Sequence, residues 1–204
     1  SRKERRPDMS ARLLRHDTYD RKPWNNGGGI TRDVWLWPET ATQDAFDIRL
    51  SLASIDTDGP FSAFPGIDRT ITLVAGSPFV LVFSGGREHR MELLQPLSFD
   101  SVQTPLSRLG KAGVSAFNVM TRQGRWTHEV SIVHGGEPFN KALPHNAIAI
   151  LHAVLGTWQV DAGDRLVAGV RDTVVVELAQ SMHLNAPAGA TAVVAILQPA
   201  EDTS

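Results

Sequence analysis

Two arginines in strand-like segments have the chemistry to bind an anion. Alternation of side chains along a strand places Arg49 and Ser51 on one face and the aliphatic residues between them on the other. If that face lines a barrel interior, the planar guanidinium needs a carboxylate from the protein or from a ligand, and Arg69 has the same requirement. The alternative is that each arginine pairs with a neighbouring aspartate on a solvated surface, Arg49 with Asp47 and Arg69 with Asp68.

A run of three glycines marks a second candidate region, in the segment Trp24-Asn25-Asn26-Gly27-Gly28-Gly29-Ile30-Thr31-Arg32. Three ordered glycines imply positive φ angles or a close approach of the backbone to another group. A strand-like alternation follows instead of a helix, and Arg32 stands where a dinucleotide-binding fingerprint needs its third glycine, so a nucleotide site is disfavoured. The run is either a simple hairpin turn or a ligand-binding corner with Trp24 as its apolar wall.

The remaining polar groups favour binding over catalysis. Asn118 and Met120 share one strand face, and an amide in this apolar run needs partners from the backbone or from a ligand. The sequence contains no cysteine and no Gly-x-Ser-x-Gly elbow, which leaves few candidates for a nucleophile. The 7 histidines lack the spacing of a metal site, although histidines from distant segments could still converge, so a metal-dependent enzyme stays open.

Composition indicates a globular protein with a small-molecule partner. The chain has 204 residues, of which 42% are hydrophobic and 21% charged, enough for one large all-β domain or two small ones. A formal net charge of -2 gives no reason to expect nucleic acid or an anionic membrane as a partner. The charged residues 1–11 lack the apolar stretch of a secretory signal, no later run is long enough to span a bilayer, and cysteine is absent. We therefore expect a cytoplasmic protein with a disordered leader.

Short β-rich segments separated by turn formers predict an all-β fold. Apolar runs such as residues 71–74, 79–83 and 173–176 are bounded by glycine, proline or aspartate at regular intervals, as in sandwiches and barrels. The pattern around Gly76 is repeated around Gly156, which two similar barrel modules would explain, although chance could also produce it.

The expected boundaries follow from a seam near Gly135-Gly136-Glu137-Pro138, where glycine and proline interrupt the β pattern. They are a leader at 1–11, a first half with the candidate site at 12–134, a second half at 135–198 completed by strands from the first segment, and a tail at 199–204.

Three motifs together resemble the HutD/Ves family: the glycine run at 24–32, Asp58-Gly59-Pro60-Phe61-Ser62 with Pro65-Gly66-Ile67-Asp68-Arg69, and Phe117-Asn118-Val119-Met120. The resemblance spans residues 12–197 and implies a cupin-type jelly-roll fold in a bicupin arrangement of two similar halves. It also implies a role in bacterial histidine utilisation, with binding of an intermediate such as N-formylglutamate and regulation of the pathway. Ala116 and Ser101 depart from the family pattern, which tends to have an acid and a glycine there. The spacing of metal-binding cupins is missing from both halves, which supports a binder without a metal.

The sequence thus favours a non-catalytic bicupin that binds a small carboxylate, with Arg49 and Arg69 pairing with its carboxylates. The candidate ligand-binding residues come from the three motifs and the Arg49 strand: Trp24, Asn26, Gly28, Thr31, Arg49, Ser51, Phe61, Ser62, Arg69, Asn118 and Met120. We expect no cofactor, no metal, and no nucleic-acid or membrane partner, and a homodimer is left open. The alternatives are a cupin isomerase, hydrolase or oxygenase with a metal held by scattered histidines, and a structural or protein-binding module with a filled barrel.

Overall fold

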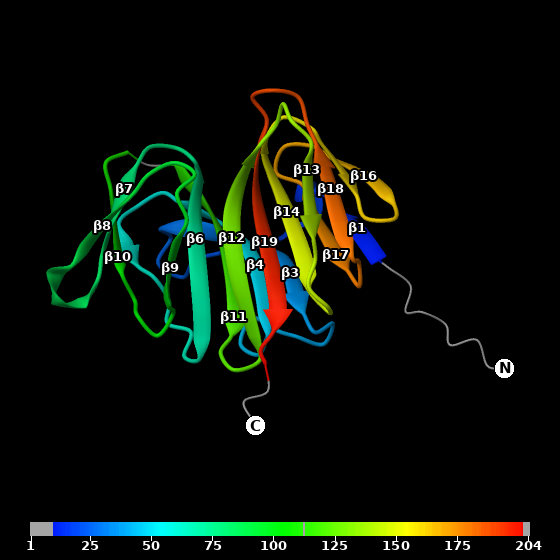
Figure 1. The fold of residues 1–204 in the computed structure, drawn as a ribbon. Coiled ribbons are helices and arrows are strands. Elements are labelled where there is room, and N and C mark those ends of the chain that lie inside the picture. The colour runs from blue at the N-terminus through cyan, green and yellow to red at the C-terminus, as the bar shows by residue number, and fades with distance from the viewer. Residues whose placement is uncertain (1–9, 112, 202–204) are drawn as a thin grey trace. The chain divides into compact units, whose positions relative to one another are not determined.

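The chain folds almost entirely into β-strands, as the alternating sequence predicts. The computed structural model describes residues 10–111 and 113–201. Over those ranges it contains nineteen strands and two single-turn 3-10 helices, η1 (His16–Thr18) and η2 (Ser84–Gly86), with no α-helix (Figure 1). No helix in the described ranges is both long and apolar enough to cross a membrane. The prediction of an all-β fold is confirmed.

The strands form two compact units. We call Tyr19–Thr127 the central half, and the unit that joins Ser1–Thr18 with His128–Ser204 the terminal half. The chain passes between them at the start of β12 (Trp126–His134), ahead of the glycine and proline residues at 135–138. Residues 1–9 of the expected leader and 202–204 of the expected tail lie outside the described residues, while Ser10 and Ala11 belong to strand β1.

A six-stranded and a four-stranded antiparallel sheet build the central half. The larger has the order β2 (Asp20–Pro23), β3 (Gly29–Trp37), β4 (Ile48–Ile55), β11 (Val114–Arg122), β6 (Ile67–Ala75), β9 (Leu97–Asp100). The smaller has the order β5 (Gly59–Pro60), β10 (Leu106–Leu109), β7 (Phe79–Val82), β8 (Glu88–Met91). Strands β4, β11 and β6 lie in the middle of the larger sheet, so their side chains are the best placed to line an interior.

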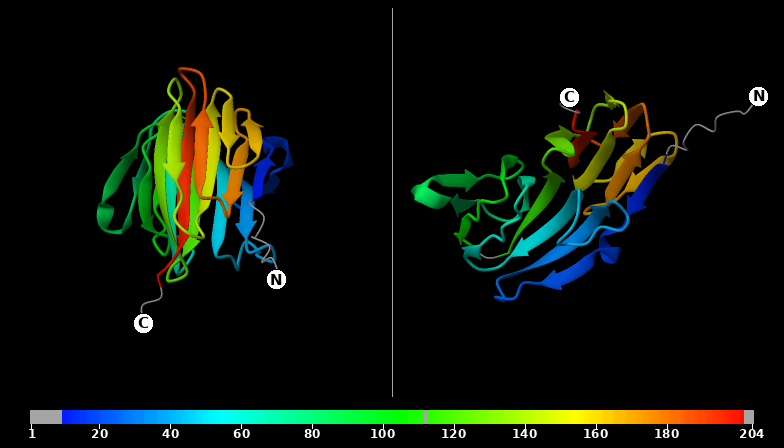
Figure 2. Two further views of the ribbon diagram at one scale, coloured as in Figure 1. Left: turned by 45° about the vertical axis from the view of Figure 1, so that its right-hand side comes forward. Right: turned by 90° about the horizontal axis from the view of Figure 1, so that it is seen from below.

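The terminal half also has two sheets. The larger has the order β1 (Ser10–Leu14), β17 (Thr173–Glu177), β14 (Ile148–Leu155), β19 (Thr191–Pro199), and then β12. The smaller has the order β13 (Phe139–Ala142), β18 (Ser181–Asn185), β15 (Trp158–Asp161), β16 (Arg165–Ala168). The red strand β19 lies between β12 and β14 in Figure 1 and in the left view of Figure 2.

The two halves repeat one topology. In the central half the strands run β4-β11-β6-β9 in one sheet and β5-β10-β7-β8 in the other, and in the terminal half β12-β19-β14-β17 and β13-β18-β15-β16. Each order becomes the other when every strand number changes by eight. Gly76 and Gly156 follow the equivalent strands β6 and β14, and both have positive φ angles, 96° and 74°. The repeat in the sequence therefore reflects two jelly-roll halves of the same construction.

The two halves bury different polar residues: the buried arginines of the described ranges lie in the central half, whereas the terminal half buries His152, Asp172, Thr173 and Thr191. Aliphatic and aromatic side chains such as Leu151, Trp158 and Val174 pack together in the terminal half, each no more than 1% exposed. The central half has an apolar cluster of its own that includes Leu73 and Phe79. Polar residues are buried beside that cluster, on strands β4, β6 and β11: Arg49, Ser51, Arg69 and Asn118. Because buried polar groups are unfavourable without partners, they mark the central half as the place to look for a ligand.

Candidate functional site

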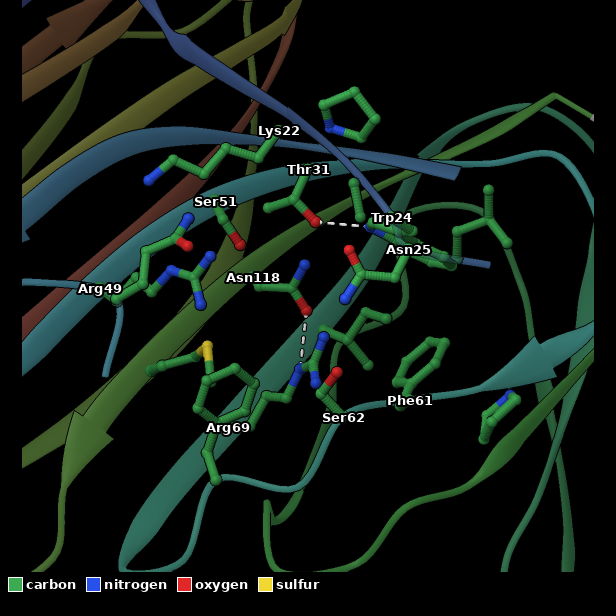
Figure 3. A pocket seen from close by; sticks show the side chains of 18 of the residues that line it. Lys22, Trp24, Asn25, Thr31, Arg49, Ser51, Phe61, Ser62, Arg69 and Asn118 are labelled. Carbon is green, nitrogen blue, oxygen red and sulfur yellow. Dashed lines mark hydrogen bonds between the residues drawn. The ribbon is translucent and has the colours of Figure 1, made fainter. Parts of the chain in front are cut away.

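A cavity of about 590 Å³ lies within the central half (Figure 3). Its walls come from one face of the larger sheet, the β2–β3 turn, and the segments after β3 and β5: Lys22, Pro23, Trp24, Asn25, Asn26, Thr31, Gln43, Asp44, Arg49, Ser51, Ala53, Ile55, Pro60, Phe61, Ser62, Phe64, Arg69, Ile71, Asn118 and Met120. The presence of this polar cavity contradicts the alternative of a filled barrel for this half.

Strand register explains which side chains reach the cavity. Met120 on β11 pairs with Arg49 on β4 and with Arg69 on β6, so the two arginines flank one methionine in a single row. Asn118 pairs with Ser51 in the next row. Residues that pair directly across antiparallel strands point to the same side of the sheet, and alternation then sends every second residue inward. The predicted common face of Arg49 and Ser51, and that of Asn118 and Met120, are both confirmed.

Arg49 is buried and paired with an acid from the neighbouring strand β3. Its Nε and Nη2 atoms each lie 2.8 Å from Oδ1 of Asp33, and the side chains of both residues are under 10% exposed. The guanidinium carbon lies 5.5 Å from the ring centre of Phe64 and 6.0 Å from that of Phe46. Stacking against aromatic rings and a charge-assisted pair hold this cation in one position.

Arg69 is equally buried but has no acidic partner within residues 10–111 and 113–201. Its Nε donates to Oδ1 of Asn118 at 2.9 Å, and its guanidinium carbon lies 4.9 Å from the ring centre of Phe61 and 5.8 Å from that of Phe99. Among the described residues no carboxylate forms an ion pair with it. Burial, and then repulsion from Arg49, lower the pKa of Arg69 to about 9, so the side chain is still a cation at neutral pH.

The pairing of each arginine with a neighbouring aspartate is wrong. Asp47 precedes β4 and pairs with Arg122 and Arg125, while Asp68 accepts a hydrogen bond from Gln123. Asp68 is adjacent to Arg69 on β6 and therefore points to the opposite face, whereas Asp47 lies outside β4 and its carboxylate is taken by Arg122 and Arg125.

Asn118 is oriented by Arg69 so that its amide N–H groups are left for another acceptor. Because the side-chain oxygen accepts from Arg69, the NH2 group points elsewhere, and its nearest acceptor is the Ala116 carbonyl at a long 3.5 Å. In Figure 3 Asn118 lies between Arg49 and Arg69, with the Ser51 hydroxyl beside it. The arrangement offers a guanidinium, an amide donor and a hydroxyl to one bound group.

The glycine run forms the turn of the β2–β3 hairpin and one wall of the cavity. Gly27 has a φ of 71°, and a side chain on Gly29 would lie 2.5 Å from the Ser54 carbonyl oxygen. Gly28 does not line the cavity: its N–H donates to Oδ1 of Asn26 at 2.9 Å, and a side chain there would meet the Thr57 hydroxyl at 2.7 Å. Glycine at 28 is therefore explained by packing, and its expected contact with a ligand is corrected.

Trp24 is fixed at this wall by a hydrogen bond from its Nε1 to the Thr31 hydroxyl at 2.8 Å. We expect Trp24→Phe to lower the free energy of unfolding by about 1 kcal/mol, because one part-buried hydrogen bond is lost while the aromatic wall stays. Urea titration measures this change. Thr31→Val removes the acceptor, so the double variant should lose little more than either single variant, and fully additive losses would contradict the assignment.

A sequence model of the HutD family matches residues 16–194. The chain belongs to the HutD family. Protein Ves of Citrobacter koseri is 33% identical over 144 residues, which cover 70% of this chain and 71% of that protein. Protein Ves of Escherichia fergusonii is 40% identical over 100 residues, and this chain spans about half the length of that relative, 51%. The resemblance to the HutD/Ves family is confirmed.

Solved structures share the fold of this chain, and one of them is a HutD protein. HutD from Pseudomonas fluorescens SBW25 superposes with a TM-score of 0.79 at 25% identity, covering 94% of this chain and 100% of that one. YhhW from Escherichia coli shares the fold with a TM-score of 0.69 at 8% identity, over 94% of this chain and 99% of that one. The cupin-type jelly-roll expectation is confirmed.

Of the eleven candidate residues in this HutD-family chain, ten line the cavity, and Gly28 is the exception. Sequence reasoning missed Asp33, Lys22 and Gln43. Thr31 and Asp33 alternate onto the same face of β3, which is the signal that could have found the acid. Neither Ala116 nor Ser101 lines the cavity. Ala116 packs in the apolar cluster, and Ser101 lies buried in the turn after β9, where its hydroxyl has no hydrogen-bond partner in the described part of the chain.

Among the described residues that line the cavity there is no histidine. Within residues 10–111 and 113–201, no group of three or more histidine, aspartate or glutamate side chains is placed to hold a metal ion.

Proposed function

We propose that this HutD-family protein is a non-catalytic binder of a small carboxylate such as N-formylglutamate, and that binding regulates histidine utilisation. The observation that carries the proposal is Arg69, a buried cation that faces a cavity and has no carboxylate partner among the described residues. A buried unpaired charge is strongly unfavourable, and a ligand carboxylate would relieve it.

The donors around Arg69 suit a carboxylate. Its Nε is used by Asn118, while its two terminal nitrogens have no acceptor among the described residues. A planar guanidinium binds a carboxylate through parallel hydrogen bonds, and Asn118 and Ser62 add neutral donors at the same cavity wall. The cavity volume lies in the range of small-molecule sites, and Trp24 and Phe61 give it apolar walls.

The proposed role in the histidine pathway rests on membership of the HutD family. HutD membership links the chain to histidine utilisation, and among the intermediates of that pathway N-formylglutamate carries carboxylates and an amide-like formyl group. Such a ligand matches the mixture of cationic, amide and hydroxyl groups in the cavity.

Thermal unfolding with added ligand tests the proposal. N-formylglutamate at about 100 times its Kd should raise the Tm by several degrees, because a ligand that binds only the folded state stabilises it. The neutral diamide of the same compound should give no shift. If no carboxylate of the pathway changes the Tm, the proposed function is wrong.

The regulatory part needs a separate measurement. A strain with a binding-deficient variant of this protein should show altered expression of the histidine-degrading enzymes when grown on histidine. Expression equal to that of the wild type in a strain whose variant no longer binds would contradict a regulatory role.

A further inference from the structure

Two buried guanidinium groups line the cavity, but the protein neutralises only one of them. Arg49 and Arg69 flank Met120 in the same row of the sheet, and they are close enough for the charge of Arg49 to disfavour that of Arg69. Arg49 is paired with Asp33, whereas Arg69 has only the neutral Asn118. The difference between the two arginines therefore depends on Asp33.

The carboxylate of Asp33 is saturated by groups of the protein. Oδ1 accepts from two nitrogens of Arg49, and Oδ2 accepts from Nζ of Lys22 at 3.3 Å and from the side-chain amide of Gln43. Asp33 is 6% exposed in its side chain and does not line the cavity. Asp33 therefore influences the cavity indirectly, through its contacts with Arg49, Lys22 and Gln43, which do line the cavity.

The buried groups around the cavity have a net charge of about +1, which one anionic group of a ligand would neutralise. Arg49 and Asp33 cancel, so Arg69 contributes one uncompensated positive charge. Lys22 is 41% exposed and shares its ammonium between Asp20 and Asp33, which makes it a weak, solvent-screened partner for an anion. Asp44, the acid that does line the cavity, is exposed.

We propose that Asp33 is a specificity-determining residue, which by neutralising Arg49 limits the buried part of the cavity to one ligand carboxylate. A second carboxylate of a ligand then stays at the exposed side of the cavity, near Lys22. This inference rests on the proposed function, because it requires that the cavity binds carboxylates. For a dicarboxylate it means that one end is recognised by Arg69 and the other end is weakly selected.

Two probes of equal length isolate the effect of the second charge. Glutarate has two carboxylates, and glutaramate has one carboxylate and one neutral amide. Calorimetric titration should give Kd values within about threefold of each other for the wild type. In Asp33→Asn the guanidinium of Arg49 is released while the shape of the side chain is kept, so the preference for glutarate should increase by about tenfold.

Asp68→Asn is the matched control. It removes the same charge from an exposed residue of the central half that does not line the cavity and accepts a hydrogen bond from Gln123, and it leaves the pair of Asp33 and Arg49 intact. The ratio of the two Kd values should therefore stay at the wild-type value. An equal gain in glutarate preference in Asp68→Asn would show a general charge effect and overturn the role of Asp33.

A variant of both residues of the pair tests the inference even if Asp33→Asn alone does not fold. In the double variant of Asp33→Asn with Arg49→Gln both charges of the buried pair are absent, so the net charge beside the cavity is that of the wild type. The ratio of the two Kd values should then stay at the wild-type value. A preference for glutarate that is still about tenfold higher without Arg49 would overturn the inference.

The outcomes separate the inference from the proposed function. If N-formylglutamate binds and the ratio does not change in Asp33→Asn, only the inference is wrong. If neither probe nor N-formylglutamate binds the wild type, the cavity is not a carboxylate site and both are wrong.

Discussion

Arg69→Met is expected to weaken ligand binding by about 100-fold or more and, at the same time, to raise the Tm of the free protein. The charged hydrogen bonds to the ligand carboxylate disappear, and each such bond is worth about 1.5–3 kcal/mol. In the free protein a buried cation without an acid is replaced by an apolar chain between Phe61 and Phe99. Removing the buried charge stabilises the folded protein by more than the lost hydrogen bond to Asn118 destabilises it. A net gain of about 1 kcal/mol in the free energy of unfolding corresponds to an increase in Tm of about 2–4 °C.

Thermal unfolding with and without N-formylglutamate measures both effects in one experiment. Arg108→Met is the control, because it removes the same charge from an exposed residue of the central half, paired with Glu88 outside the cavity. It should leave the ligand-induced shift unchanged. A full shift in Arg69→Met would show that the carboxylate binds elsewhere.

Lowering the pH from 7 to 5 should reduce the free energy of unfolding by about 2 kcal/mol through His152 alone. This histidine of the terminal half is 1% exposed and lies 2.9 Å from the Thr173 hydroxyl. Burial, and then the charge of Arg171, lower its pKa from 6.5 to about 3. The unfolded chain therefore binds a proton as the pH falls below 6.5 while the folded protein does not, so stability decreases toward pH 3.

Urea titrations at pH 7 and pH 5 check this expectation. In His152→Gln the difference between the two pH values should shrink by most of that amount, whereas His183→Gln, at an exposed position of the same half, should keep it. Asp172 does not affect this comparison. Burial raises its pKa, but hydrogen bonds from His16 and Gly169 outweigh that effect and lower the pKa from 3.8, so its contribution to stability is lost only as the pH falls through 3.8 and below. An unchanged difference in His152→Gln would contradict the assignment.

Much of the site could be predicted because it follows from local rules. Alternation along β4 and β11 fixes which residues point inward, and the glycine run fixes the hairpin that carries Trp24 and Asn26. The partner of Arg49 could not be predicted in this way. Asp33 lies on another strand, and a register shift separates its pairing with Ser51 from the pairing of Trp35 with Leu50. Which acid meets Arg49 therefore depends on that irregularity, which the sequence pattern does not reveal.

In the fold, too, features set by neighbouring residues could be predicted, whereas pairings between distant segments could not. The repeated pattern at Gly76 and Gly156 was sufficient to suggest two similar halves, because each glycine ends an equivalent strand. The pairing of β1 with β17 had no such signal, since it joins Leu14 to Thr173 across most of the chain. Alternation of apolar and polar residues predicts that a segment is a strand and which of its faces is buried. It does not predict which other strand pairs with it.

The division of the terminal half along the chain has a consequence for synthesis on the ribosome. Every strand of the central half has been translated once residue 127 is made, so the barrel that holds the cavity can close while the following strands are still being elongated. The terminal half forms later, because β1 precedes the central half in the chain while its partner β17 and the sheet-internal strand β19 both follow it. A nascent chain that stalls before β19 would contain a complete central half and an incomplete terminal half.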